Sequence, residues 1–223
     1  NPRQFAANED LSRYPRDEAG DLAKLASVGC DLVWAPSPEA MYPAGFATAV
    51  VPAGAAAGLE SDFRPHFFQG VATVCTKLFT QVAPEVAVFG EKDYQQLCVV
   101  RQIVRDLDLR LAIVGLPTVR EPDGLAMSSR NRYLSAEERS RAPLIDRVIR
   151  KVAARVRAGE PIGAVTTEAR RELEADGWRV DYVEVRDAVT LAVPAGGHQT
   201  GPLRVLAAAW LGSTRLIDNV AAG

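Results

Sequence analysis

The expected fold follows from one stretch of the sequence, Val86-Ala87-Val88-Phe89-Gly90-Glu91-Lys92-Asp93-Tyr94-Gln95-Gln96-Leu97. A short apolar run of β type meets a glycine, two charges of opposite sign follow, and a segment with helical character begins. Asp93 is a good N-cap candidate, because its carboxylate can accept hydrogen bonds from the first amides of a helix. The stretch therefore predicts a strand, a tight turn and a helix.

A turn of this kind predicts a binding site for an anion. In an open parallel sheet, ligands bind at the carboxyl ends of the strands, and a helix N-terminus there favours negative charge. Lys92 adds a positive charge suited to a phosphate. A solvated surface loop would show the same local pattern. The neutral amides of Gln95 and Gln96 favour the binding site, since they can hydrogen-bond a polar substrate without adding charge.

On both sides of this stretch, helix and strand patterns alternate from residue 17 to residue 114. Such alternation is typical of a parallel sheet with helices on its faces. Residues 1–118 are therefore expected to form an α/β domain. Its expected helices are residues 17–27, 70–83 and 94–107, and its expected strands are residues 31–36, 48–51, 86–89 and 110–114.

The pattern changes after Pro117. A Pro122-Asp123-Gly124 turn precedes a capping box at Ser135 and Glu138, which starts a long basic helix expected to reach Ala158. Another helix follows, then a strand of alternating pattern and two further strands. Residues 119–223 are thus expected to form a smaller α+β domain with an antiparallel sheet. Its second helix begins near residue 161, and its strands lie near residues 183–186, 203–209 and 215–217.

Composition excludes several classes of protein. A net charge of −2 provides no strong field for nucleic acid or for a membrane surface. Three cysteines without metal spacing indicate buried free thiols in a reducing compartment, here the cytoplasm. Two histidines form no metal cluster, and no apolar run is long enough to span a membrane. The three tryptophans are expected to be packing residues.

A second candidate site is the segment Met127-Ser128-Ser129-Arg130. Two hydroxyls and a guanidinium can bind phosphate oxygens, although a serine-rich turn that caps the next helix explains the same residues. Asn1 and Gln4 could bind a substrate or merely satisfy a loop backbone. Asp21 is a candidate Mg²⁺ ligand, and a solvated helix face is the alternative.

The basic helix that follows could contact nucleic acid, but no aromatic residues are interleaved with its arginines, so a solvated face is expected.

Taken together and in this order, the motifs resemble the pantoate–β-alanine ligase family over essentially the whole chain. The most specific segments are Gly90-Glu91-Lys92-Asp93-Tyr94-Gln95-Gln96 and Met127-Ser128-Ser129-Arg130-Asn131. The other matching segments are Asn1-Pro2-Arg3-Gln4-Phe5, Tyr14-Pro15-Arg16, Asp123-Gly124-Leu125-Ala126 and Leu216-Ile217-Asp218-Asn219.

The resemblance implies a Rossmann-like nucleotidyltransferase domain with a small C-terminal lid domain. It also implies ATP-dependent condensation of pantoate with β-alanine, through a pantoyl adenylate, with release of AMP and pyrophosphate. Mg²⁺ and a homodimer are expected on the same ground. Lys92, Ser128 and Ser129 would be the catalytic residues. ATP would be contacted by Gly90, Glu91, Lys92, Asp93, Val119, Met127, Ser128, Ser129 and Arg130, and pantoate and β-alanine by Asn1, Gln4 and Gln96.

Two departures from the family pattern are visible. The family has an upstream segment with a His-x-Gly-His motif and a first strand, neither of which is found here, so the chain as given is expected to be inactive without them. His66 stands one place earlier than the pattern requires, so we assign it no role. Two alternatives stay open: another nucleotidyltransferase of the same superfamily, and a non-catalytic nucleotide-binding fragment.

Overall fold

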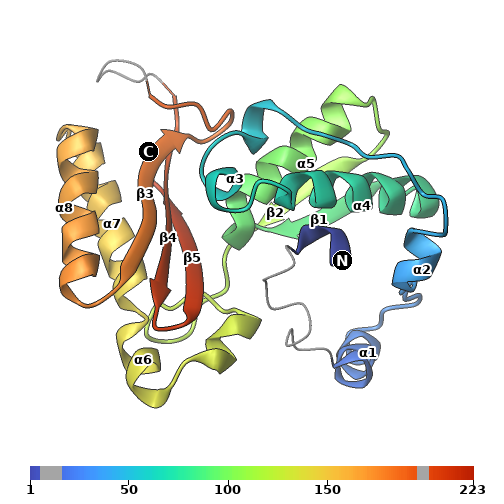
Figure 1. The fold of residues 1–223 in the computed structure, drawn as a ribbon, viewed down its shortest axis with the longest axis horizontal. Coiled ribbons are helices and arrows are strands. Elements are labelled where there is room, and N and C mark those ends of the chain that lie inside the picture. Colours follow the sequence, from blue (N-terminus) through green and yellow to red (C-terminus); the bar gives the residue numbers. More distant parts are fainter. Residues whose placement is uncertain (6–16, 195–200) are drawn as a thin grey trace.

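The computed structural model of this chain describes residues 1–5, 17–194 and 201–223. Two halves lie side by side, and each is built on its own β-sheet (Figure 1). The first sheet is a parallel pair and the second is a three-stranded antiparallel sheet. The predicted α/β class, with a parallel sheet and a C-terminal antiparallel sheet, is therefore confirmed.

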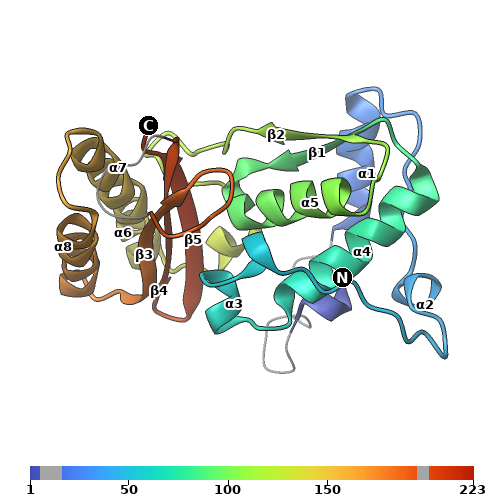
Figure 2. The same ribbon diagram turned by 90° about the horizontal axis from the view of Figure 1, so that it is seen from above.

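The N-terminal half packs its longer helices on one face of the parallel pair (Figure 2). Its elements are η1 (Pro2–Gln4), α1 (Glu18–Ser27), α2 (Pro38–Met41), η2 (Gly54–Ala56), α3 (Glu60–Phe63), α4 (Phe67–Val82), β1 (Val86–Gly90), η3 (Glu91–Asp93), α5 (Tyr94–Asp106) and β2 (Ala112–Leu116).

The stretch that predicted the fold forms β1, the single turn η3 and α5, as expected. β1 and β2 run parallel, so that Val86 lies opposite Ala112 and Gly90 lies opposite Leu116. Their carboxyl ends therefore meet at the same edge. Asp93 does occupy the N-cap position of α5, but its side chain makes no capping hydrogen bond, so the predicted capping role is wrong.

The C-terminal half is an antiparallel sheet with two long helices on its outer face (Figure 1). Its elements are η4 (Ser129–Tyr133), α6 (Ala136–Arg141), α7 (Leu144–Arg157), α8 (Ile162–Ala175), β3 (Arg179–Asp187), β4 (Leu203–Leu211) and β5 (Thr214–Ala221).

The central strand β4 is buried on both faces. Val205, Ala207 and Ala209 pack against α7 and α8, whereas Leu206 and Ala208 join the core of the N-terminal half. Because successive side chains of a strand point to opposite faces, one strand serves both cores. The inner face of the antiparallel sheet is thereby held against α5.

Two predicted strands are absent from the described residues. Residues 31–36 and 48–51 carry apolar side chains but pair with no other strand of the described chain, and Leu32 is largely exposed. An extended segment is a strand only when a neighbour satisfies its backbone groups. The prediction of strands from apolar composition alone was therefore wrong for both segments.

Residues 53–70 show no periodic pattern, so the sequence predicts an irregular segment there, but the structure has η2, α3 and the start of α4 in it. The long basic helix is also divided. Its predicted capping box at Ser135 and Glu138 is present, but α6 ends at Arg141 and α7 starts at Leu144. Pro143 lies between them, and it has no amide hydrogen to continue the helical ladder.

The structure corrects two predictions of burial. Cys75 and Cys98 are buried free thiols, but Cys30 is exposed. Trp178 is buried as a packing residue should be, whereas 56% of the surface of Trp34 is exposed. Trp34 lies in the segment that lacks its predicted strand, and Cys30 directly precedes that segment.

The two halves are joined by a buried ionic network. Glu60 of α3 accepts hydrogen bonds from Arg215 Nη1 of β5 at 2.8 Å and from the Tyr182 hydroxyl of β3 at 2.9 Å. Arg215 Nε also donates to Asp181 at 2.7 Å. Burial opposes ionisation of Glu60, but the hydrogen bond and charge of Arg215 outweigh it and lower the pKa of this carboxyl.

Two local predictions lie outside the described residues. The sequence predicts a loop that enters Glu9-Asp10-Leu11, and at Tyr14-Pro15-Arg16 the proline predicts a stop before the first helix. Among the residues that the structure describes, no helix is long and apolar enough to cross a membrane.

We expect the three thiols to differ in reactivity. Burial raises the pKa of Cys75 to about 12 and that of Cys98 to about 11, so neither forms thiolate near neutral pH. An aromatic disulfide reagent at pH 8 should label Cys30 rapidly in the native chain, and a Cys30→Ser variant should lose this fast phase. Fast labelling that persists in the variant would contradict the burial of the other two.

Replacing Glu60 should destabilise the junction in a pH-dependent way. Its pKa is lowered from 4.5, so its stabilisation is present above that value and is lost as the pH falls through the folded-state pKa. We expect Glu60→Gln to lower the free energy of unfolding by about 3 kcal/mol at pH 7 and by less near pH 4. Urea denaturation measures this, with the exposed Glu168→Gln as control; a pH-independent loss would refute the ionic contribution.

Candidate functional site

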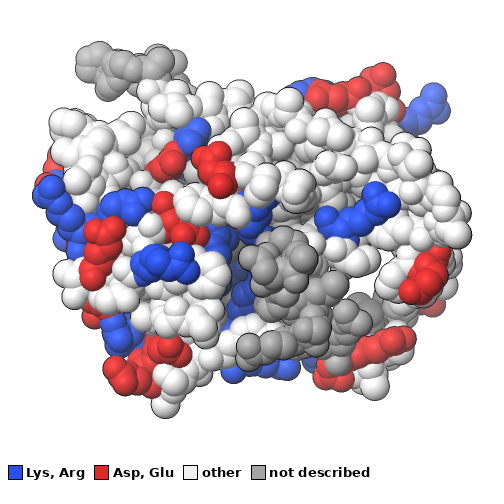
Figure 3. Space-filling view, viewed as in Figure 1, with Lys and Arg blue, Asp and Glu red and all other residues white. Residues whose placement is uncertain are grey.

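A cavity of about 1330 Å³ lies between the two halves. It is lined by η1 and α3, by the turn that follows β1, by the loop before η4, and by the inner face of the antiparallel sheet. Lys and Arg side chains gather in the middle of the face where the two sheets meet (Figure 3). The cavity thus lies at the carboxyl end of β1, where the sequence placed a site.

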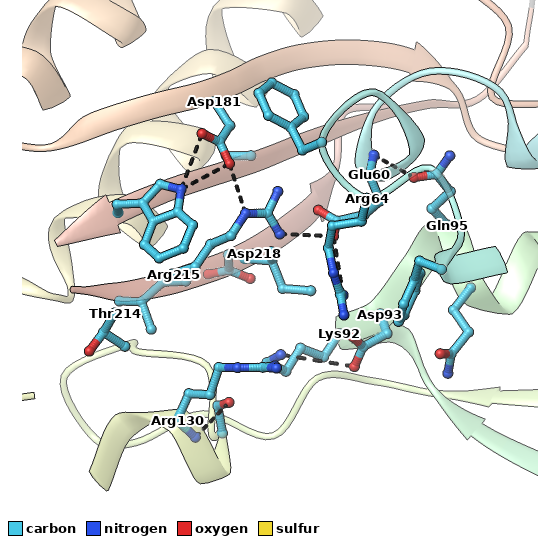
Figure 4. Close-up of a pocket in the computed structure, with 18 of the residues that line it drawn as sticks. Glu60, Arg64, Lys92, Asp93, Gln95, Arg130, Asp181, Thr214, Arg215 and Asp218 are labelled. Carbon is cyan, nitrogen blue, oxygen red and sulfur yellow. Dashed lines mark hydrogen bonds and ion pairs between the residues drawn. The ribbon is translucent and has the colours of Figure 1, made fainter. Parts of the chain in front are cut away.

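Lys92 projects into this cavity from the turn after β1 (Figure 4). Its ammonium lies 3.9 Å from the carboxylate of Asp93, which is longer than a hydrogen bond. The side chain of Lys92 is only 20% exposed. The ammonium protons are therefore not committed to Asp93, and in partly desolvated surroundings they attract an anion more strongly than at the surface.

Arg130 enters the cavity from the opposite side, on the loop that leads into η4 (Figure 4). Ser128 also lines the cavity, and its hydroxyl oxygen accepts a hydrogen bond from the Arg130 amide at 3.3 Å. Ser128 therefore caps η4, as the serine-rich turn alternative expected, and at the same time faces the cavity. Ser129 is not among the lining residues.

The neighbouring side chains of Gln95 and Gln96 make different contacts. Both glutamines line the cavity, but Gln95 is buried and its amide is already bound to the backbone at Glu60, Ala55 and Gly58. The inference that both amides serve a substrate is therefore wrong for Gln95, which holds the segment around α3 in place.

Asn1 and Gln4 reach the cavity because the N-terminal segment lies across α4. The Asn1 side chain donates to the carbonyl of Gly70 at 3.1 Å and accepts from the Tyr42 hydroxyl at 2.8 Å. A side chain at Gly70 would collide with the carbonyl of Arg3, so the close approach requires glycine. Asn1 thus anchors the segment that carries Gln4.

Several predicted site residues do not line the cavity. Glu91 pairs with Arg204 at 3.0 Å. The exposed side chains of Val119 and Met127 lie beside one another, since the Met127 amide donates to the Val119 carbonyl at 2.9 Å. Gly90 contributes only backbone at the end of β1. Asp21 is exposed on α1 and pairs with Lys24 at 3.2 Å.

The structure adds cavity residues that the sequence prediction did not include. Glu60, Arg64 and Arg215 line the wall opposite Arg130 (Figure 4), and Tyr182 also lines the cavity. Arg64 donates to the Gln4 carbonyl at 3.2 Å and its guanidinium lies over the Phe67 ring. The Arg64-Pro65 dipeptide before a helix was a signal for Arg64, but residues as distant as Glu60 and Arg215 come together only in the folded chain.

The geometry suits a polyanionic ligand. Lys92 and Arg130 point toward the same part of the cavity, where both would attract an anion that lies between them (Figure 4). The carboxylates of the far wall, Glu60 and Asp181, are already paired with Arg215. Neutral amides at Gln4 and Gln96 complete a lining in which a small polar molecule can lie beside the anion.

Comparisons with known sequences agree on one family. The family model described as Pantoate-beta-alanine ligase matches residues 1–221. The chain is 58% identical over 221 residues to the pantothenate synthetase of Mesorhizobium japonicum, covering 99% of this chain and 77% of that protein. It is 56% identical over 222 residues to pantothenate synthetase 2 of Bradyrhizobium diazoefficiens, covering 99% and 78%.

Solved structures agree with the sequences. The pantothenate synthetase of Thermus thermophilus superimposes with a TM-score of 0.93 at 44% identity, covering 100% of this chain and 80% of that chain. The pantoate–β-alanine ligase of Francisella tularensis, complexed with β-γ ATP and β-alanine, superimposes with a TM-score of 0.80 at 30% identity, covering 100% and 76%. By sequence and by fold, the chain belongs to the pantoate–β-alanine ligase family.

Proposed function

We propose that the cavity between the two sheets condenses pantoate with β-alanine while ATP is converted to AMP and pyrophosphate. The observation that carries this proposal is the convergence of Lys92 and Arg130 beside the neutral amides of Gln4 and Gln96. The ligands named for the related Francisella ligase, β-γ ATP and β-alanine, support it.

The first step joins two anions. A carboxylate oxygen of pantoate attacks the α-phosphorus of ATP, the bond from phosphorus to the bridging oxygen breaks, and pyrophosphate leaves. Lys92 and Arg130, with the hydroxyl of Ser128, would offset the repulsion and stabilise the negative charge that grows in the transition state. Ser129 does not line the cavity, so its hydroxyl would join them only after the loop that carries it moves. In this scheme Lys92, Ser128 and Ser129 are the catalytic residues.

The second step consumes the pantoyl adenylate. The amine of β-alanine attacks the acyl carbon, the bond to the AMP oxygen breaks, and the amine loses a proton. Gln4 and Gln96 would hold pantoate through neutral hydrogen bonds, leaving its carboxylate free to attack. Asn1 would lie near the same substrate and Gln4 would border the β-alanine site, since both residues line the cavity.

The nucleoside part of ATP would lie along the edge of the cavity. Val119 and Met127 present adjacent exposed apolar side chains, a surface against which an adenine ring can pack. Asp93 would approach the ribose, while Gly90 and Glu91 would contact ATP through the backbone of the turn. The Glu91 carboxylate is engaged with Arg204, which leaves its backbone for this role.

We propose Mg²⁺ as a companion of the ATP phosphates rather than as an ion held in a protein cage. The described residues contain no group of acidic, histidine or cysteine side chains arranged to hold a metal. Asp21 does not fit such a site, since it is exposed, paired with Lys24 and outside the cavity lining. Magnesium bound mainly by substrate phosphates needs few protein ligands.

We further propose that residues 1–118 form a Rossmann-like catalytic domain and residues 119–223 a lid. Each part has its own sheet, and the lid carries Ser128 and Arg130 on one loop. A lid that closes would exclude water from the mixed anhydride, which is a reactive acyl donor.

Pantoate-dependent exchange of labelled pyrophosphate into ATP tests the proposed function. In the full-length protein that carries this sequence, Lys92→Ala should reduce exchange by at least ~100-fold with little change in fold, because it removes a charge from the transition state. Lys151→Ala, an exposed lysine of α7 paired with Glu172, is the matched control and should keep normal exchange.

Three outcomes would contradict the proposal. Exchange of normal rate in Lys92→Ala would refute its role. Exchange that needs no pantoate would favour another nucleotidyltransferase, and a folded protein that binds no ATP would favour a non-catalytic nucleotide-binding fragment.

We propose that the protein is a homodimer, on the ground of its family membership. Sedimentation velocity of the full-length protein should give twice the protomer mass across micromolar concentrations. A single species of protomer mass throughout that range would rule the dimer out.

A further inference from the structure

Asn219 of β5 binds the turn that carries Lys92. Its side-chain amide donates to the carbonyls of Glu91 and Lys92, both at 2.9 Å. Its side-chain oxygen accepts from Arg204 Nε at 2.7 Å. Asn219 is 3% exposed, so each of these bonds replaces a contact with water that burial removed. The antiparallel sheet thereby fixes the backbone at the residue that projects into the cavity.

Arg204 reinforces this attachment. It pairs with the Glu91 carboxylate at 3.0 Å, and its guanidinium stacks on the Tyr94 ring at 3.8 Å from the centroid. One arginine of β4 thus holds Asn219, the side chain of Glu91 and the first residue of α5. The antiparallel sheet thus binds the turn through its backbone and through the side chains of Glu91 and Tyr94, which flank Lys92 and Asp93.

The preceding residue, Asp218, attaches the other cavity loop. Its carboxylate accepts two parallel hydrogen bonds from Arg120, at 2.7 and 2.8 Å, and its side chain is fully buried. Arg120 also donates to the Gly124 carbonyl at 2.9 Å and pairs with Asp146 of α7 at 2.8 Å. Arg120 lies at the start of the loop that leads to Ser128 and Arg130, and an isolated bridge to Ala126 closes that loop.

We propose that Asp218 and Asn219 are positioning residues that set the Lys92 turn and the Ser128–Arg130 loop at their working separation. This inference rests on the proposed function. Two adjacent residues of one strand point to opposite faces, and here one holds each phosphate-binding segment. Neither residue needs to touch ATP; each acts through the backbone of a segment that does.

The geometry explains why the pair would matter to the reaction. Lys92 and Arg130 stand on different halves of the molecule, and a shift of about 1 Å in a catalytic group can cost ~100-fold in rate. The spacing of these two cations depends on the segments that carry them. The bonds from β5 supply that spacing before ATP arrives.

The test is a double-mutant cycle in the full-length protein. We expect Asn219→Ala to reduce pantoate-dependent pyrophosphate exchange by about 30-fold, within the range for a misplaced catalytic group. In a Lys92→Ala background the same change should reduce exchange by less than about twofold, because its effect is transmitted through Lys92. Equal losses in both backgrounds would overturn the proposal for Asn219.

Ligand binding gives a second readout that does not depend on turnover. By calorimetry, Asn219→Ala should weaken binding of ATP by about tenfold and leave adenosine binding unchanged, as expected for an effect on a phosphate contact. Equal weakening of both ligands would indicate general damage to the cavity and contradict the proposal.

Two further variants separate positioning from stability. Val165→Ala, in the core of α8 away from the cavity, should lower the thermal midpoint without lowering exchange at 25 °C. Asn219→Ser, which keeps a donor on a shorter side chain, should retain more exchange than Asn219→Ala. If Val165→Ala reduced exchange as much as Asn219→Ala at a similar midpoint, the role of Asn219 would be only structural.

For Asp218, the corresponding cycle uses Asp218→Asn with Arg130→Ala. The neutral amide keeps the shape of the side chain but not its ion pair with Arg120, so exchange should fall in the parent and change little in the Arg130→Ala background. Equal losses in both backgrounds would overturn the proposal for Asp218.

The same measurements separate this inference from the proposed function. Loss of exchange in Lys92→Ala with normal exchange in both β5 variants would overturn only this inference, whereas normal exchange in Lys92→Ala would refute the proposed function itself.

Discussion

Polar side chains of the antiparallel sheet are buried against the N-terminal half and form hydrogen bonds with it. Arg215 and Tyr182 donate to Glu60 of α3, and Asn219 donates to the carbonyls of the Lys92 turn. An unpaired charge or amide at this depth would cost far more than a pair contributes. These partners therefore determine how the two sheets meet, and the cavity is the space that remains between them.

This junction has a chemical consequence. Cations from both halves approach one another at the cavity, and the carboxylates on its far wall are already engaged with Arg215. The pKa of Asp218 is raised because burial disfavours its charge more than the Arg120 hydrogen bonds favour it. The Asp218 carboxylate therefore depends on its two hydrogen bonds from Arg120 to stay charged. These bonds also fix the position of Arg120 and of the loop that leads to Ser128. A phosphate chain would complete an arrangement that the protein has already built.

Membership of the ligase family fits this physical picture without a protein nucleophile. The chemistry joins a carboxylate to a phosphate and then an amine to an acyl group, and what it requires is placement of anions and exclusion of water. Gln95 and Gln96 contribute to the cavity in different ways. The Gln95 amide holds the wall of the cavity through hydrogen bonds to the backbone, and Gln96 lines the cavity.

Local elements whose signals lie within a few residues could be predicted from the sequence alone. The strand, turn and helix from Val86 onward, the capping box at Ser135 and the alternation at residues 183–186 were predictable, because periodicity and caps act over one or two turns of chain. The motif resemblance also identified Lys92, Gln4, Gln96 and Arg130, which the structure brings to one cavity.

The other features of the fold and of the site depend on contacts between residues that are distant in the sequence. Residues 31–36 and 48–51 look like strands by composition, but a strand also needs a paired neighbour, which is a non-local condition. Trp34, which lies in the first of these segments, is 56% exposed. The partnership of Glu60 with Arg215, 155 positions away in the chain, and the hold of Asn219 on the Lys92 turn have no local signature. Hydrogen bonds between distant residues depend on how the two sheets pack, and packing is a property of the whole chain.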